Sequence, residues 1–172
     1  MTVTVTNAQR EAPVHTQQMR QLAARTLRYL KIRTRGTVAV TFLGARAMRR
    51  VNQRFGHHDT ATDVLSFRYD GEPTCLPPRL RGRQVVGEIF VAPRIARRYA
   101  KAHGLSYREE LARYVIHGLL HWAGHEDRTL AQQQKMRAME DCLLNISNCE
   151  LRIANRKNGQ SEIRNPKSAI RK

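Results

Sequence analysis

Cysteine is scarce in this sequence, with three residues among 172: Cys75, Cys142 and Cys149. No two of them have the Cys-x-x-Cys spacing that is typical of redox motifs and zinc ribbons. Cys142 and Cys149 are seven residues apart on one predicted helix, about two turns, which is too far for a disulfide. We therefore expect buried free thiols in a reducing cytoplasm and no disulfide scaffold.

Long apolar runs and aromatic residues are also few. No run approaches the roughly 20 apolar residues of a membrane-spanning helix, and the N-terminus lacks the basic and apolar regions of a signal peptide. Aromatic residues make up 6% of the chain, so we do not expect nucleic-acid binding by extensive base stacking. The length and the 41% hydrophobic content indicate one globular, cytoplasmic domain with no membrane partner.

Acidic residues are outnumbered. The chain has 14 Asp and Glu against 31 Lys and Arg, for a net charge of +17 and a pI near 11.1. Residues 151–172 contribute +6 of this charge, so +11 remains on residues 1–150. Such an excess indicates a polyanionic partner, and we favour nucleic acid. The arginines that we expect to contact phosphate are Arg49, Arg50, Arg94, Arg97 and Arg98. The alternative for any single cluster of them is a solvent-exposed helix face without a binding role.

The hydrophobic periodicity predicts a single α+β domain with a mixed four-stranded sheet and about five helices. Helices should cover one face of the sheet more heavily than the other. The expected strands are 3–5, 38–42, 64–67 and 85–92, and the expected helices are 16–32, 45–55, 93–103, 106–121 and 129–148. Capping-box patterns open the last two helices, at Ser106 and at Thr129. Residues 70–84, rich in Gly, Pro and Arg, are expected to form a loop.

The most informative segment lies at the end of the fourth predicted helix. His117 and His121 are one helical turn apart, so both imidazoles can point at one position. Gly124 can adopt the left-handed conformation that ends a helix, and the return of the chain could bring Asp127 or His125 to the same position. Two imidazoles and a third ligand are typical of catalytic zinc, although a His-x-x-x-His pair also arises by chance.

Four blocks of the sequence occur in the order found in one known family. The first contains Asn52 and Thr62-Asp63-Val64-Leu65-Ser66-Phe67, and the second is Gly87-Glu88-Ile89. The third runs from His117 to Asp127, and the fourth is Met136-Arg137 with Glu140. Together they resemble the YbeY family of bacterial metal-dependent endoribonucleases over roughly residues 1–150. This resemblance implies a YbeY-like metallohydrolase domain over residues 1–151, with the metal at the end of a central helix.

The resemblance also implies the site residues. One zinc ion per chain is expected on His117, His121 and Asp127, with aspartate at a position where most members have histidine, as in a subgroup of the family. His125 is the competing third ligand. Catalytic candidates are Arg54, Asp63 and Ser66, although Asp63 could equally cap a strand end. Gly56 stands where members often carry an arginine, and Arg54 is the candidate substitute.

The activity implied by the resemblance is zinc-dependent cleavage of single-stranded RNA in 16S rRNA maturation and ribosome quality control, with an rRNA precursor and the small ribosomal subunit as partners. Activated water and the neighbouring 2′-hydroxyl both stay open as the nucleophile. One alternative is a non-catalytic RNA-binding assembly factor with a zinc site. Another is a zinc metalloprotease, but Gly118 fills the position of the general-base glutamate of that class.

Beyond the domain, residues 152–172 are expected to be a basic, disordered tail. Residues 160–166 and 167–172 are near copies with a seven-residue period. They contain a proline and lack an apolar seam, so the repeat does not predict a coiled coil.

Overall fold

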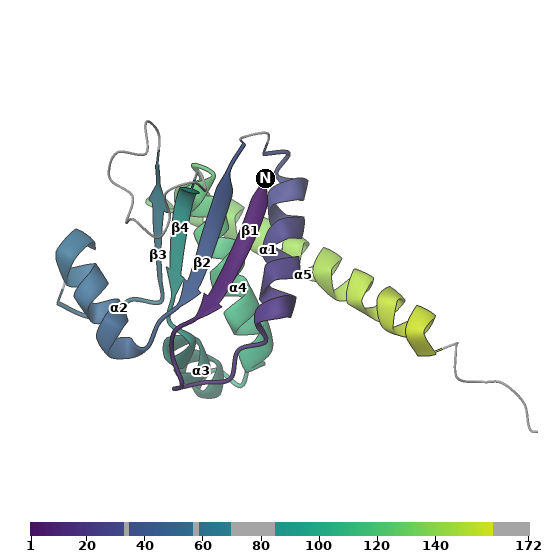
Figure 1. The fold of residues 1–172 in the computed structure, drawn as a ribbon, viewed down its shortest axis with the longest axis horizontal. Coiled ribbons are helices and arrows are strands. Elements are labelled where there is room, and N and C mark those ends of the chain that lie inside the picture. Colours follow the sequence, from purple (N-terminus) through teal and green to yellow (C-terminus); the bar gives the residue numbers. More distant parts are fainter. Residues whose placement is uncertain (33–34, 57–58, 70–84, 160–172) are drawn as a thin grey trace, which may run out of the picture.

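The four segments with alternating apolar residues form one mixed sheet in the order β1-β2-β4-β3. The strands are β1 (Thr2–Asn7), β2 (Thr37–Phe42), β3 (Val64–Arg68) and β4 (Val85–Val91). β1, β2 and β4 are parallel, whereas β3 runs antiparallel to β4 at the edge of the sheet. The predicted mixed four-stranded sheet is therefore confirmed (Figure 1).

The structure, a computed structural model, describes residues 1–32, 35–56, 59–69 and 85–159, and for residues 147–159 it describes the backbone alone. The predicted loop 70–84 and the end of the predicted tail, 160–172, lie outside the described residues.

The five predicted helices are also present, and one of them ends in a π-helical turn. They are α1 (Thr16–Tyr29), α2 (Ala45–Val51) with the π-helical turn η1 (Asn52–Gly56), α3 (Pro93–Ala102), α4 (Tyr107–Trp122) and α5 (Leu130–Gly159). α1 and α4 pack against one face of the sheet, and α3 and α5 pack against α4. α2 lies beside the edge strand β3, and elsewhere the opposite face carries no helix of the described part (Figure 1).

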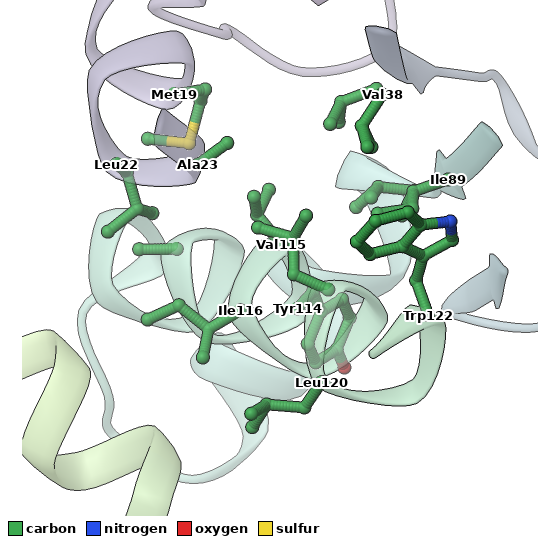
Figure 2. Packing of buried hydrophobic residues seen from close by; sticks show 14 of the residues in the cluster. Met19, Leu22, Ala23, Val38, Ile89, Tyr114, Val115, Ile116, Leu120 and Trp122 are labelled. Atoms are coloured by element: carbon green, nitrogen blue, oxygen red, sulfur yellow. The ribbon is translucent and has the colours of Figure 1, made fainter. Parts of the chain in front are cut away.

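Side-chain alternation decides which residues enter the core. Val38 and Val40 of β2 lie beside Gly87 and Ile89 of β4 and face the helices. The residues that alternate with them, such as Glu88 and Phe90, face the other side of the sheet. Figure 2 shows Val38 and Ile89 together with core side chains of α1 and α4, and all of them belong to a single core.

Helix α4 is the central helix of that core. Val115, Ile116, Leu119 and Leu120 are fully buried, so the helix is apolar over most of its circumference rather than along one stripe. Trp122 is buried as well, and its indole Nε1 donates to the Val86 carbonyl at 3.1 Å. The prediction that Trp122 belongs to the core rather than to a base-stacking surface is confirmed.

Both predicted capping boxes form hydrogen bonds at helix starts. Ser106 Oγ accepts from the Glu109 amide at 3.5 Å, and Thr129 Oγ1 accepts from the Gln132 amide at 3.3 Å. Gln132 Oε1 in turn accepts from the Thr129 amide at 2.9 Å. These bonds satisfy amides that the first helical turn leaves without intrahelical partners.

The C-terminal helix is longer than the sequence indicates. α5 was expected to end near Asn148, but it continues to Gly159, so residues 152–159 are helical rather than disordered. The apolar pattern fails there, yet Leu, Arg, Ala and Lys are good helix formers and no proline or glycine interrupts them before Gly159. Intrinsic propensity extends the helix beyond the apolar pattern.

The expectation of buried thiols is wrong for Cys142, which is exposed on α5 and lies 3.6 Å from the Tyr29 hydroxyl. No described helix has both the length and the apolar character needed to cross a membrane.

Candidate metal centre

His117 and His121 lie one turn apart on α4, and their Nε2 atoms are 3.0 Å apart. The chain leaves the helix through Gly124, whose φ of +95° is the left-handed conformation expected of it. The return brings Asp127 back, with Oδ2 at 3.8 Å from His117 Nε2 and 3.6 Å from His121 Nε2. Within the described residues, these three side chains form the group that could hold a metal ion.

The spacing of the three ligand atoms suits a small divalent cation. The circle through points at these separations has a radius of about 2.0 Å, and zinc binds imidazole nitrogen and carboxylate oxygen at about 2.0–2.2 Å. The side chains are 26% to 40% exposed, so one side of the position stays open to solvent. An open position distinguishes catalytic zinc sites from closed structural ones.

Hydrogen bonds fix the tautomers of both histidines. His121 Nδ1 donates to the His125 carbonyl at 2.9 Å, and His117 Nδ1 donates to Glu140 Oε1 at 2.8 Å. In the neutral rings, both Nε2 atoms therefore carry lone pairs, which point at each other and at the Asp127 carboxylate. The three lone-pair atoms repel one another unless a cation lies between them. This set of metal-ligating atoms therefore fits a bound metal ion.

His125, the competing third ligand, contributes its backbone rather than its ring to this arrangement. Its carbonyl orients His121, and its imidazole is not part of the three-residue group. Asp127 takes the third position because two further residues are needed before the chain points back at α4.

A buried network supports His117 from behind. Glu140, on α5, is 4% exposed and accepts from both His117 and Arg113, the latter at 3.0 Å. Arg113 also pairs with Asp141 at 2.7 Å. Burial disfavours the charged imidazolium, but the hydrogen bond and negative charge of Glu140, with the charges of Asp127 and Asp63, outweigh it and raise the pKa of His117.

Two of the three candidate ligands, His117 and Asp127, line a cleft of about 280 Å³ between α3, α4, α5 and the start of β3, and His121 lies next to His117. Asp63 lines this cleft, and its Oδ1 also accepts from the Val64 amide and from Thr62 Oγ1, each at 2.9 Å. Both roles considered for Asp63 are thus compatible with its position. Ser66 Oγ donates to the Gly118 carbonyl at 2.8 Å and so ties β3 to α4 next to His117; its catalytic role stays a prediction.

Gly118 lies where α4 packs closely against the sheet. A Cβ at this position would lie 2.6 Å from Ile89 Cγ2 and 2.8 Å from Val64 Cγ1. The position therefore faces the sheet rather than the metal cleft. A metalloprotease needs a glutamate here that reaches the metal-bound substrate, so this geometry gives the metalloprotease alternative no support.

A family model described as Endoribonuclease YbeY matches residues 4–148, which include every site residue named above. The chain belongs to the YbeY endoribonuclease family. The Endoribonuclease YbeY of Chlamydia felis is 32% identical over 149 residues, which cover 83% of this chain and 90% of that protein. That of Salinibacter ruber is 36% identical over 138 residues, covering 76% and 87%.

A solved structure has the same fold. The solution structure of TM1509 from Thermotoga maritima has a TM-score of 0.58 and 22% identity, covering 97% of this chain and 99% of that one. The YbeY resemblance drawn from the four sequence blocks is therefore confirmed, with residues 149–172 beyond the family match.

The glycine that departs from the YbeY pattern has a packing reason. A Cβ on Gly56 would overlap Oδ1 of Asn52, which is buried and donates from Nδ2 to the Thr60 carbonyl at 2.8 Å. Arg54, the proposed substitute for the family arginine, lies over the Phe55 ring at 5.4 Å and lines a different groove. The packing thus explains why a glycine occupies position 56. It does not explain a catalytic role of Arg54, which stays a prediction.

The arginines expected to bind RNA differ in their surroundings. Arg49 forms a two-pronged pair with Asp59, from Nε at 2.8 Å and from Nη2 at 2.6 Å, so its guanidinium already has an anionic partner. Arg94, Arg97 and Arg98 are exposed on α3. Tyr99 of the same helix lines the metal cleft, so α3 carries positive charge to its edge.

Glu140 and Arg113 are the site residues that sequence reasoning did not assign. Glu140 was recognised only as part of a family block, although it is the hydrogen-bond partner of a candidate metal ligand, His117. Arg113 is four residues before His117, on the same face of α4, and that spacing is the signal that could have identified it.

Substitution of Glu140 tests whether this network supports the metal. Glu140→Gln should keep the shape of the side chain but remove the charge that strengthens His117 as a ligand, and zinc affinity should fall by about 10- to 100-fold. The measurement is competition with a chromophoric chelator. Asp141→Asn is the matched control, because Asp141 also pairs with Arg113 but does not touch His117. Equal zinc affinity of both variants and the wild type would contradict the role of Glu140.

Proposed function

We propose that this chain is a zinc-dependent endoribonuclease that cleaves single-stranded RNA, and that it acts in 16S rRNA maturation and ribosome quality control. The observation that carries the proposal is the convergence of two Nε2 lone pairs and one carboxylate oxygen on a solvent-open position. Membership in a family of endoribonucleases and the net charge of +17 support RNA as the substrate.

A zinc ion at this position would supply Lewis acidity toward a phosphoryl oxygen and toward water. The protein's own groups prepare that position. Glu140 and the His125 carbonyl hold the two imidazoles in the orientation in which Nε2 faces the cleft. Asp63 places a further carboxylate at the cleft, where it can orient a substrate hydroxyl or a water molecule.

Single-stranded RNA fits the site better than a duplex does. His117 and Asp127 line a cleft, so one phosphate and its sugar must enter it, and an unpaired strand can bend to do so. The exposed arginines of α3, Arg94, Arg97 and Arg98, would neutralise neighbouring phosphates. We place this activity in the cytoplasm, on an rRNA precursor of the small ribosomal subunit.

Metal removal tests the zinc requirement. Treatment with EDTA should reduce cleavage of an unstructured RNA oligomer to background, and one equivalent of zinc per chain should restore it, because the open position carries the chemistry. Denaturing gels measure cleavage, and elemental analysis measures the bound metal. Full cleavage in the presence of chelator would contradict the proposal.

The same reactions separate the two nucleophiles and the alternative functions. A 2′,3′-cyclic phosphate end on the product indicates attack by the neighbouring 2′-hydroxyl, and a linear phosphate formed without this intermediate indicates water. Casein incubated in parallel should stay intact. RNA binding without cleavage at any metal concentration would favour the non-catalytic assembly factor instead.

A further inference from the structure

A second groove lies on the face of the sheet opposite to the helices. It has a volume of about 670 Å³ and lies between α2, η1 and β4. We call it the phenylalanine groove, and the residues that define it are Leu43, Ala47, Arg50, Arg54, Phe55 and Phe90. It shares no lining residue with the metal cleft.

Two of the four phenylalanines of the chain, Phe55 and Phe90, line this groove, and the ring of a third, Phe67, contacts both. The Phe55 and Phe67 rings are 5.2 Å apart at 69°, and Phe67 and Phe90 are 5.8 Å apart at 67°. The first ring in this chain of edge-to-face contacts, Phe55, is 56% exposed. A buried core would cover such a ring, whereas a binding surface leaves it accessible to a flat aromatic ligand.

The charges around the phenylalanine groove select an anionic ligand. Arg50 and Arg54 are among its lining residues, and no acidic side chain of the described part lines it. Glu88, which β4 places on the same face of the sheet, accepts a hydrogen bond from the Tyr69 hydroxyl at 2.7 Å. An apolar floor with aromatic rings and cationic edges matches a nucleobase with its phosphate.

β3 connects this groove to the metal cleft. Asp63, just before the strand, lines the cleft, and Ser66 bonds to α4. Phe67 is the next residue and, because side chains alternate along a strand, faces the opposite side. The two sites therefore lie on the two sides of one edge strand, and an unpaired RNA strand passing around that edge could occupy both.

We propose that the phenylalanine groove binds an unpaired base of the RNA substrate, by stacking on Phe55, while Arg50 and Arg54 hold the adjacent phosphates. The inference rests on the proposed nuclease function, and it names the surface that holds the strand away from the cleavage position. Low aromatic content excludes stacking over an extended track, but one local platform needs few rings.

Phe55→Ala tests the proposal. RNA binding is measured by fluorescence anisotropy with the full chain in EDTA, where the labelled, unstructured oligomer stays intact. Loss of one stacked base should weaken RNA binding by about five- to tenfold or more without changing the dependence of affinity on salt. Phe55→Trp should retain wild-type affinity, and Phe55→Leu should behave like Phe55→Ala because it keeps apolar area but loses the ring. Tyr29→Ala, at an aromatic 51% exposed on α1, is the matched control and should bind as the wild type does.

Oligomers with single abasic positions locate the base. In the wild type, one abasic position at a fixed distance from the cut should weaken binding, and Phe55→Ala should be insensitive to that position. Equal affinity of Phe55→Ala and the wild type overturns the proposal. The proposal is also overturned if the only effect of Phe55→Ala is that a dimer dissociates, because the groove would then bind a second copy of this chain. Lower thermal stability with unchanged affinity would assign it to the chain's own packing and has the same consequence.

Binding under EDTA does not depend on cleavage, so the two hypotheses fail separately. If RNA binding depends on Phe55 but no metal-dependent cleavage is found, the nuclease proposal is refuted and the proposed base-binding role of the groove is retained. If cleavage depends on metal but Phe55→Ala does not change RNA affinity, the nuclease proposal is retained and the proposed base-binding role of the groove is refuted.

Discussion

His121→Ala should abolish RNA cleavage while leaving RNA affinity within about twofold of the wild type. The substitution removes one of the three converging ligand atoms, and the remaining pair, His117 Nε2 and Asp127 Oδ2, are 3.8 Å apart with no third ligand to complete the site. We expect kcat/KM for an unstructured oligomer to fall by about 1000-fold or more, since metal binding and the chemistry fail together. The affinity should persist because the arginines supply it from other elements.

Two measurements make this result interpretable. Elemental analysis should show loss of bound zinc from His121→Ala, and a thermal melt should show that the variant stays folded, because the side chain is partly exposed. His15→Ala, at an exposed histidine before α1, is the matched control and should retain both zinc and activity. Undiminished turnover by His121→Ala would refute the proposed role of the site, whatever its metal content.

Gly118→Glu should cause the largest loss of stability among the substitutions considered, about 4 kcal/mol or more in the free energy of unfolding. The first side-chain atom would already meet Ile89 and Val64, and the carboxylate would be buried against the sheet without a partner. The variant also places a glutamate at the position of the metalloprotease general base. Because that position faces the sheet, we expect no peptidase activity from it.

Smaller changes at the same position separate close packing from charge. Gly118→Ala should destabilise by about 1–3 kcal/mol through overpacking, even though alanine favours a helix over glycine by about 1 kcal/mol. Combining it with Val64→Ala should be less destabilising than the sum of the two, because Val64 Cγ1 is one of the obstructing atoms. Arg108→Glu, an exposed position on α4, should change stability by no more than about 0.5 kcal/mol. Urea denaturation measures all five variants, with Val64→Ala alone among them, and a stable Gly118→Glu protein would contradict the close approach of α4 to the sheet.

Local sequence rules predicted the elements of this fold well because each rule depends on neighbours along the chain. The two capping boxes, the left-handed Gly124 and the i, i+4 histidine pair need only one helix and its ends. The predicted end of α5 was wrong because it was placed where the apolar periodicity is lost, whereas helix propensity continues to Gly159. The exposure of Cys142 depends on how α5 lies against the domain, which no local rule contains.

The sequence by itself determined the α+β class, the pair of candidate metal-binding histidines one helical turn apart and the basic character of the body, because composition and periodicity encode all three. The tertiary structure alone decided that Glu140 supports His117 across 23 residues, that Gly118 faces the sheet, and that three phenylalanines distant in sequence form one series of ring contacts. These are contacts between elements that are distant in sequence. Their geometry follows from strand register and helix packing, which are cooperative properties of the whole fold rather than of any segment.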